Sequence, residues 1–327
     1  MKAKLAGILL LSLLGGLLVL SNRRGSPYMG HVRVKVLQVT PDYRLIEHSL
    51  GQTKVPLSPR RIASLGGAFT ESLLAMDIQP VAVESSFAIG EAGKASSHLA
   101  SRLKGVPVVG VSGNIDLEAV AAAKPDLILL SGNENSLWFH YLSRVAPTVA
   151  IAMYGMPPDR ERDALLNVGD IIGRPRQAEA VLAEYDRKVQ RAKAILARRI
   201  GSKPVLYLMV SNQRCMSRPL IHKALLVDRL GLTFDPTVLD RPDSVTWDFL
   251  SIERLSRLQA EYIFVGTMSK RENYWKEIAE SPYCKAVPAI QHGHVYQVKH
   301  STWTGQGILA GEAMLDQLLA ATRSRHR

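Results

Sequence analysis

The chain has 327 residues, of which 46% are hydrophobic and 21% are charged. This composition excludes a disordered, collagenous or coiled-coil protein, and the length suffices for two ordinary domains. Two cysteines are too few for a disulfide framework or a four-cysteine zinc module. Whether Cys215 and Cys284 pair with each other stays open at this point.

The net charge of +12 is concentrated at the two ends of the chain. Residues 1–61 carry ten Lys and Arg against two acids, and three arginines follow residue 322. Residues 62–322 therefore hold 28 basic and 27 acidic residues. A nearly neutral body with basic ends is more typical of a membrane-facing N-terminus than of a nucleic-acid-binding face, so no nucleic-acid partner is predicted.

Residues 1–22 have the form of an export signal. Lys2 and Lys4 precede an uncharged run at residues 5–20, and neither a small-x-small cleavage motif nor a lipidation cysteine follows. This run is slightly long for a cleaved signal peptide and short for a span of about 20 residues. We predict a periplasmic or otherwise extracytoplasmic protein, and leave open whether the leader is cleaved or anchors the chain in the cytoplasmic membrane.

The N-terminal half begins with two expected strands joined by a turn and then alternates strands and helices. Alternation of this kind is typical of an α/β domain. A Gly66-Gly67 turn should lead into a helix that Thr70 caps. The expected strands are 32–38, 43–48, 61–65, 81–84, 106–109 and 126–130, and the expected helices are 70–76 and 119–123.

The pattern changes after residue 156 and then resumes. Helices are expected at 159–172 and 177–199, the second with one continuous apolar stripe. A second alternating set follows, and the whole predicts an α/β protein of two lobes joined by a long helix. The second set comprises strands 205–210, 262–265 and 295–298 and helices 224–230, 251–258 and 307–321; the lobes span 31–156 and 203–323, with the linker at 159–200.

A weak internal repeat relates the two lobes. Residues 116–130 and 251–265 both contain a capping residue, a glutamate in the first helical turn, an apolar stripe, an acid and a buried strand. Glu118 and Glu253 occupy the equivalent position, 135 residues apart. A glutamate there favours the helix dipole in any protein. Its presence in both lobes also predicts two carboxylates on one outer face of the molecule.

Motifs for catalysis are absent from the sequence, and no catalytic residue is predicted. There is no phosphate-binding loop, nucleophile elbow or zinc-protease helix. His292-Gly293-His294 is the one histidine cluster, and its spacing beside a glycine is more typical of a surface turn than of a metal site. No resident metal or cofactor is therefore predicted.

Polar and aromatic residues gather after the expected strands, where open α/β sheets bind ligands. Arginines and aromatic rings facing each other across two lobes suit a large, anionic and partly apolar ligand. The predicted ligand-binding residues are Phe69, Tyr154, Arg214, Arg218, Trp247 and Trp303.

Several short motifs in a fixed order carry a resemblance to a known family. They include Pro59-Arg-Arg-Ile-Ala-Ser-Leu65, Asp116-Leu-Glu-Ala-Val-Ala-Ala-Ala-Lys-Pro-Asp126, Leu250-Ser-Ile-Glu-Arg-Leu255 and Gly293-His-Val-Tyr-Gln-Val298. Over residues 43–322 the chain resembles the substrate-binding proteins of ABC importers for ferric siderophores, cobalamin and haem-like ligands. The resemblance implies two Rossmann-like α/β lobes bridged by one rigid helix, with the ligand in the cleft between them.

The resemblance also implies partners. By motif, Glu118 and Glu253 correspond to the glutamates with which the family engages arginines of the permease, which works with its ATPase. Hydroxamate-binding members carry an arginine just after the position of Gly110, where this chain has Val-Ser-Gly. Arg218 resembles the second-lobe arginine of catecholate-type members.

The expected function is therefore capture of an anionic ferric siderophore by a monomeric, non-enzymatic protein, with iron present only inside the bound chelate. Cobalamin or haem binding is the alternative within the class. An anchored sensor or scaffold with this fold but without transport is the alternative outside it.

Overall fold

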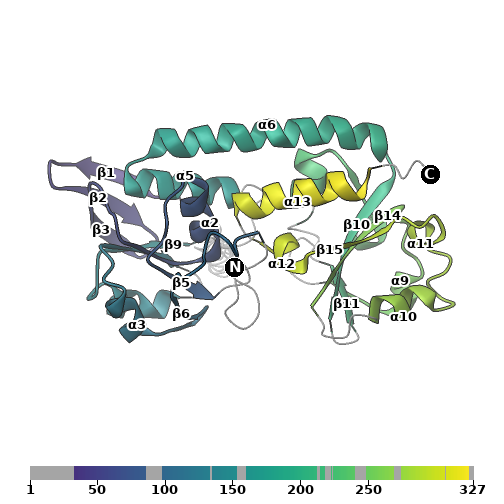
Figure 1. The fold of residues 1–327 in the computed structure, drawn as a ribbon, viewed down its shortest axis with the longest axis horizontal. Helices are drawn as coiled ribbons and strands as arrows, with labels where there is room; N and C mark the ends of the chain where they lie inside the picture. Colours follow the sequence, from purple (N-terminus) through teal and green to yellow (C-terminus); the bar gives the residue numbers. More distant parts are fainter. Residues whose placement is uncertain are drawn as a thin grey trace, which may run out of the picture.

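The computed structural model describes residues 33–85, 98–132, 135–152, 160–211, 214–217, 222, 224–239, 248–268, 274–305 and 307–323. Two α/β lobes lie side by side, and helix α6 (Pro175–Arg199) runs along both of them (Figure 1). The two-lobed α/β arrangement with a bridging helix agrees with the sequence prediction. Within the described residues, no helix combines the length and the apolar character needed to cross a membrane. The predicted leader at 1–22 lies outside these residues.

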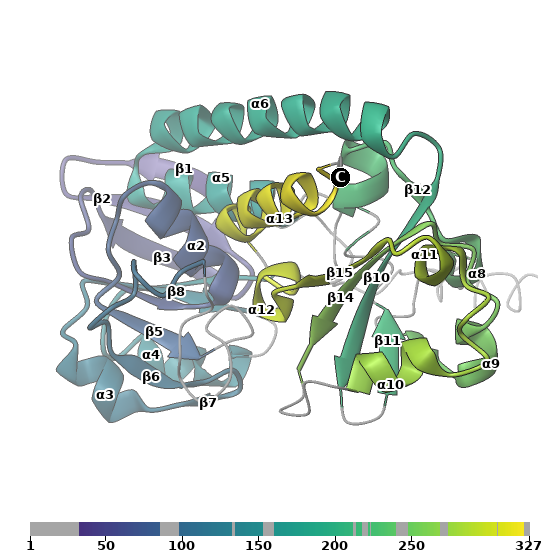
Figure 2. The same ribbon diagram turned by 45° about the vertical axis from the view of Figure 1, so that its right-hand side comes forward.

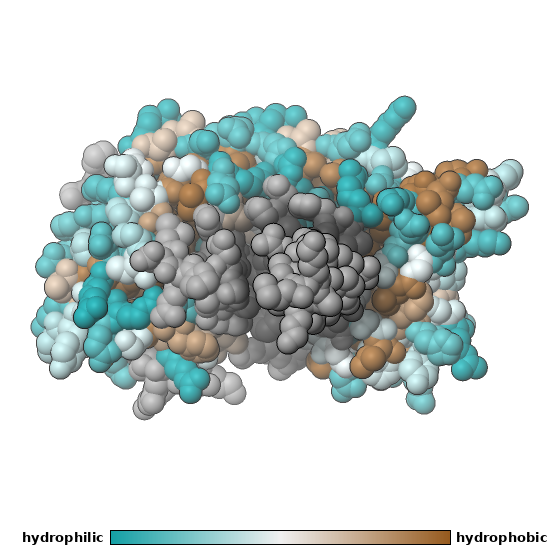
Figure 3. Space-filling model, turned by 180° about the vertical axis from the view of Figure 1, so that it is seen from behind, coloured by the Kyte–Doolittle hydropathy of each residue, from teal (hydrophilic) through white to brown (hydrophobic). Residues whose placement is uncertain are grey.

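The N-terminal lobe begins with a small antiparallel sheet in the order β1-β2-β3. The antiparallel pairing of β1 with β2 confirms the expected hairpin, while β3 adds a strand that the sequence did not predict. Every residue of β1 is exposed, and Figure 3 shows a hydrophobic patch over this edge of the molecule. The strands are β1 (Lys35–Val39), β2 (Tyr43–His48) and β3 (Gly51–Pro56).

The main sheet of this lobe has the order β7-β6-β5-β4-β8-β9 and is parallel except for β7. All residues of β4 and the Leu127–Leu130 run of β8 are buried, as expected for strands covered on both faces. The strands are β4 (Ile62–Leu65), β5 (Ala82–Ser85), β6 (Val108–Val111), β7 (Asn114–Ile115), β8 (Leu127–Ser131) and β9 (Thr148–Ile151). The helices are α2 (Gly67–Ala75), α3 (Leu117–Ala122), the 3-10 turn η2 (Ser136–Trp138), α4 (Phe139–Leu142) and α5 (Arg160–Ile172).

Helix α2 starts earlier than the sequence predicted, and Thr70 is not its cap. The helix begins at Gly67, so Thr70 lies inside its first turn. The Thr70 hydroxyl donates to Oγ of Ser64 at 2.9 Å and so ties this turn to the end of β4. A side chain at Gly66 would place its Cβ 2.6 Å from the ring of Phe69. This close approach explains the glycine at the start of the helix.

The C-terminal lobe is built on the sheet β13-β11-β10-β14-β15, with β12 paired to β10. Strands β11 and β13 were not predicted. The strands are β10 (Pro204–Ser211), β11 (Arg214–Ser217), β12 (Thr233–Phe234), β13 (Asp248–Leu250), β14 (Tyr262–Thr267) and β15 (Val295–Val298). The helices are the π-helix η3 (Ala224–Arg229), α8 (Pro236–Leu239), α9 (Ile252–Leu255), α10 (Tyr274–Glu280), α11 (Pro288–Gln291), α12 (His300–Trp303) and α13 (Ile308–Ala321).

Two predicted helices of this lobe are corrected. The turn at 224–229 is a π-helix rather than an α-helix. Helix α9 ends at Leu255 instead of continuing to 258. The backbone N–H of Gln259 donates to the carboxylate of Asp235 at 2.8 Å, which draws the chain away from the helical path.

Helix α13 ties the two lobes together. It follows the C-terminal sheet but packs against α6 and against α2 of the N-terminal lobe (Figures 1 and 2). A Cβ at Gly311 would lie 2.3 Å from the hydroxyl of Tyr185 on α6, so the two helices approach closely there. At the start of α13, the backbone N–H of Ala310 donates to the fully buried carboxylate of Glu71 on α2 at 2.7 Å. The lobes are therefore joined by two helices.

Candidate functional site

One amide side chain ties together the carboxyl ends of the N-terminal strands. Asn135 is fully buried after β8, and its Nδ2 donates to Oε2 of Glu84 at the end of β5 over 2.6 Å. Its Oδ1 accepts from the backbone N–H of Gly113 in the β6–β7 turn at 2.8 Å. The indole N–H of Trp138 donates to the Gly113 carbonyl at 3.2 Å. The edge where open α/β sheets bind ligands is thus held by hydrogen bonds around a buried carboxylate.

In the corresponding region of the C-terminal lobe, aromatic side chains pack against one another. Tyr207 in β10 stacks on Trp303, with centroids 4.9 Å apart and planes 12° apart, and Phe264 lies 5.2 Å from the same indole. The Tyr207 hydroxyl is 3.0 Å from Nδ1 of His300. Nε2 of His222 is 3.1 Å from the carbonyl of Trp303 and must carry the proton of that hydrogen bond. Aromatic packing therefore dominates here.

The predicted ligand-binding residues fall into three groups in the structure. Phe69 and Trp303 are 2% and 0% exposed, so both rings pack the core, and direct contact of either with a ligand stays a prediction. Arg214 is exposed at the start of β11, with its guanidinium 5.9 Å from the ring of Phe249. The predictions for Tyr154, Arg218 and Trp247 lie outside the described residues.

Glu118 and Glu253 lie in closely similar local structures. Asp116 caps α3 by accepting from Ala119 N–H at 2.9 Å, and Ser251 caps α9 in the same way at 3.4 Å. Both glutamates are exposed in the first turn, and the described part of the chain offers neither an ion-pair partner. A hydrogen bond from the Ser251 hydroxyl lowers the pKa of Glu253, which keeps its carboxylate ionised.

The two helices that carry these glutamates lie on the same side of the molecule. In Figures 1 and 2, α6 runs along the top, while α3 and α9 lie low on the left and right lobes. Both views share the vertical axis and agree on this placement. The helix that carries each glutamate therefore lies on the side opposite the bridging helix.

Comparison with known proteins identifies the class of this fold. Periplasmic binding proteins match residues 62–302, which is most of the chain. The chain belongs to the periplasmic binding protein family. The class that the motifs indicated, a substrate-binding protein of two α/β lobes, is thereby confirmed.

Individual relatives are distant but cover nearly the whole chain. The ferric enterobactin-binding periplasmic protein FepB of Escherichia coli is 26% identical over 278 residues, covering 80% of this chain and 85% of its own. The Fe(3+)-citrate-binding protein YfmC of Bacillus subtilis is 22% identical over 285 residues and covers 85% of each. The crystal structure of Staphylococcus aureus SirA with staphyloferrin B superimposes with a TM-score of 0.72 at 21% identity, covering 85% of this chain and 97% of SirA.

The two cysteines are free and buried in the C-terminal lobe. Burial, and secondarily the nearby Cys284, raises the pKa of Cys215 to about 12. The thiol is therefore protonated at neutral pH and unreactive as a nucleophile. Of the two alternatives left open by the sequence, this structure contains the unpaired one.

Sequence reasoning did not predict the contact between Glu84 and Asn135. They are 51 residues apart, and only the parallel order of β5 and β8 around β4 brings them within hydrogen-bonding distance. Each lies at or just after the carboxyl end of a strand. That position was the one signal available in the sequence.

Proposed function

We propose that this protein is the extracytoplasmic substrate-binding component of an ABC importer. It captures an anionic ferric chelate and delivers it to a membrane permease that works with an ATPase. The observation that carries the proposal is the family match across both lobes, together with relatives whose names specify ferric chelates. The protein acts as a monomer and without catalysis, and iron enters only inside the ligand.

Arginines of the C-terminal lobe supply the positive charge for the ligand in this proposal. Arg214 is exposed at the start of β11, and Arg218 follows directly after that strand. The ring of Phe249 lies beneath the Arg214 guanidinium and limits its freedom. A guanidinium can donate two parallel hydrogen bonds to a carboxylate or catecholate oxygen pair.

Fluorescence titration tests the ligand class. Ferric catecholate, hydroxamate, citrate, haem and cobalamin complexes are titrated against the tryptophan emission of the full chain. We expect an anionic ferric complex to bind most tightly, and Arg218→Ala to weaken it by about 1.5–3 kcal/mol, the range for hydrogen bonds to charged groups. Arg176→Ala, which removes an exposed arginine on α6, is the matched control. Tightest binding of cobalamin or haem would contradict the proposed ligand.

The glutamate pair supplies docking in the same proposal. Glu118 and Glu253 are exposed in the first turns of capped helices, and these helices lie on one side of the molecule. Arginines of a permease could contact one carboxylate from each lobe, which fixes the orientation of the complex and accelerates encounter. The proposal therefore separates ligand binding from delivery.

Transport measurements test this separation. Glu118→Ala and Glu253→Ala should each reduce uptake while ligand affinity is retained, and the double variant should reduce it further. Replacement by Lys should be more damaging because it places like charges together. Glu179→Ala, on the exposed side of α6, is the control. Normal uptake by the double variant, as the only binding protein present, would remove the docking assignment. It would also favour a sensor or scaffold.

The N-terminal segment completes the proposal. Residues 1–22 direct export, and residues 5–20 hold the protein at the membrane if the leader is retained. A reporter fused after Arg327 should be active outside the cytoplasm. N-terminal sequencing of membrane and soluble fractions distinguishes a cleaved leader from an anchor.

A further inference from the structure

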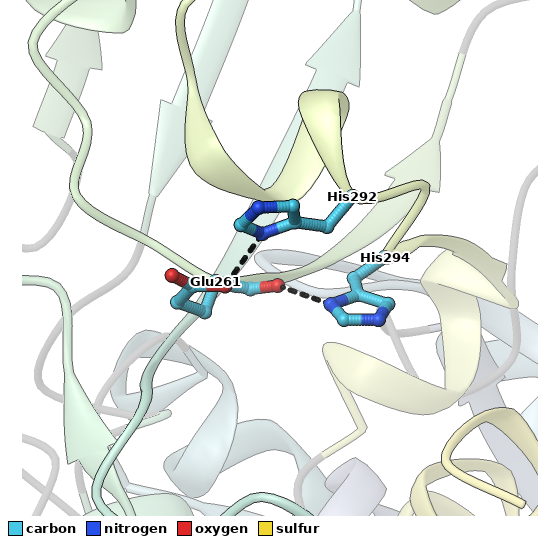
Figure 4. A group of neighbouring side chains, drawn as sticks. All are labelled: Glu261, His292 and His294. Carbon is cyan, nitrogen blue, oxygen red and sulfur yellow. Dashed lines mark hydrogen bonds and ion pairs between the residues drawn. The ribbon is translucent and has the colours of Figure 1, made fainter. Parts of the chain in front are cut away.

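A cluster of two histidines and one glutamate lies at the amino ends of β14 and β15, the end of the sheet opposite the candidate ligand site. The strands are parallel, with Ile263 opposite Val295, so Glu261 lies beside the turn that precedes β15. This turn contains His292 and His294 (Figure 4). Three side chains that can bind metals thus come together from two separate parts of the chain.

Glycine and backbone hydrogen bonds fix this turn. Gly293 has φ +69°, a conformation that favours glycine, and it lets both neighbouring imidazoles face Glu261. The N–H of His294 donates to the Ala289 carbonyl at 2.8 Å, and Ala289 N–H donates to the Ala260 carbonyl at 2.9 Å. The arrangement of the histidines is therefore built into the backbone.

The donor atoms already converge. Nδ1 of His292 lies 2.9 Å from Oε2 of Glu261, and Nδ1 of His294 lies 3.2 Å from the carbonyl oxygen of the same residue. One ligand atom from each of the three side chains lies within 4.8 Å of the others. The ring of Tyr262 stacks on His294 at 4.6 Å and 4°, which restricts that imidazole. The His292 side chain is 53% exposed, so an ion can reach the cluster from solvent.

The chemistry of these donors selects a class of ion. Two imidazole nitrogens and one carboxylate oxygen suit zinc and its neighbours copper and nickel, whereas magnesium and calcium prefer oxygen alone. Zinc bonds of about 2.0–2.1 Å require ligand atoms roughly 3.4 Å apart in a tetrahedron. The ligand atoms now lie within 4.8 Å of one another, with the Glu261–His292 pair at 2.9 Å, so side-chain adjustments of about an ångström meet this geometry.

We propose that Glu261, His292 and His294 form a surface site for one divalent late first-row metal ion, with Zn²⁺ as the probe. Each imidazole now donates from Nδ1 to a Glu261 oxygen. On metal binding its proton moves to Nε2 through solvent, and Nδ1 gives its lone pair to the metal. The Glu261 carboxylate supplies the third ligand, and water completes the coordination. The two present hydrogen bonds are replaced by metal bonds. This proposal does not depend on the proposed transport function.

Calorimetric titration of the full-length, untagged protein with Zn²⁺, after treatment with a chelator, tests the site. We expect one saturable site whose affinity falls about tenfold or more in His292→Ala, in His294→Ala and in Glu261→Gln. His140→Ala removes an exposed histidine elsewhere and should leave the affinity unchanged. The affinity for Zn²⁺ should also decrease as the pH is lowered, because protonated imidazole does not bind metal.

Thermal unfolding with and without Zn²⁺ gives a second readout that does not depend on heats of binding. The ion should raise the unfolding temperature of the wild type and of His140→Ala, but not that of the His292→Ala/His294→Ala double variant. Absence of saturable binding to the wild type overturns the proposal. So does equal binding by the double variant, which would place the metal elsewhere on the chain.

Discussion

The two lobes hold the carboxyl ends of their strands by different means on similar frameworks. The N-terminal lobe uses buried hydrogen bonds centred on Asn135 and Glu84. The C-terminal lobe uses a stack of rings centred on Trp303. By contrast, α3 and α9 present the same capped first-turn glutamate in both lobes. The internal repeat at 116–130 and 251–265 therefore preserves the exposed glutamate in both lobes, while the contacts at the strand ends differ between the lobes.

The largest expected effect is the loss of stability when the indole of Trp303 is removed from the C-terminal lobe. Trp303 is fully buried, and its indole N–H donates to Gln317 at 3.2 Å. Trp303→Ala should lower the free energy of unfolding by about 3–5 kcal/mol, because a large cavity replaces the stack. Urea unfolding followed by circular dichroism measures this loss. Trp303→Phe keeps part of the stack and should lose less; equal losses would show that stacking area is not the cause.

Removing the side-chain amide of Asn135 should destabilise the N-terminal lobe. Asn135→Leu deprives the buried Glu84 carboxylate of its 2.6 Å hydrogen bond. The expected loss is about 1.5–3 kcal/mol, the range for hydrogen bonds to charged groups. Asn114→Leu, at an exposed position of β7, is the control and should change stability by less than about 0.5 kcal/mol. A loss no larger than the control would mean that the network does not hold this edge.

The third prediction concerns the pH dependence of stability that His48 gives to the N-terminal lobe. Burial lowers the pKa of His48 in β2 to about 4, while its Nδ1 accepts from Leu50 N–H and its Nε2 lies 2.9 Å from the Thr53 hydroxyl. The unfolded chain, with a histidine pKa of about 6.5, therefore binds more protons than the folded chain between these values. The contribution of His48 is complete above pH 6.5 and is lost as pH falls toward 4.

Lowering the pH from 7 to 5 should therefore reduce the free energy of unfolding by on the order of 2 kcal/mol through His48. Denaturant unfolding at closely spaced pH values checks the slope. His48→Phe should be less stable at pH 7 but should lack this part of the pH dependence. An unchanged slope in His48→Phe would assign the pH dependence to other groups.

The smallest expected effect tests whether Glu118 and Glu253 are equivalent in the two lobes. Glu118 and Glu253 are both exposed in first turns, so Glu118→Ala and Glu253→Ala should change the unfolding temperature very little and by similar amounts. Parallel thermal unfolding of the two variants measures this. A large loss in one alone would show that the two carboxylates do not play equivalent roles.

Local periodicity made most of the framework predictable. Strand β2 has the predicted bounds, and α5 and α6 differ from prediction by one or two residues at their N-termini. The predicted stripe of α6 is buried from Ala178 to Leu196, with only Val181 partly exposed. These elements obey short-range patterns that a single sequence contains.

The site was less predictable because its contacts are long-range. The Asn135–Glu84 bond and the Glu261–His292 pair join residues 51 and 31 positions apart. Trp303 was predicted to face a ligand because it follows a strand; its ring is fully buried, and its contact with a ligand stays a prediction. Composition at a strand end does not tell whether a ring turns inward or outward. Strands β11 and β13 are short and lie at one edge of their sheet, so they lack a distinctive pattern.

The position of α13 in the chain has a consequence for how the molecule is made. Glu71 and its partner Ala310 are 239 residues apart, so the first lobe waits for nearly the whole chain before its α2 surface is covered. A protein synthesised from its N-terminus cannot finish this lobe until the last helix has emerged. Termination shortly before residue 308 would therefore impair the first half of the molecule as well as the second.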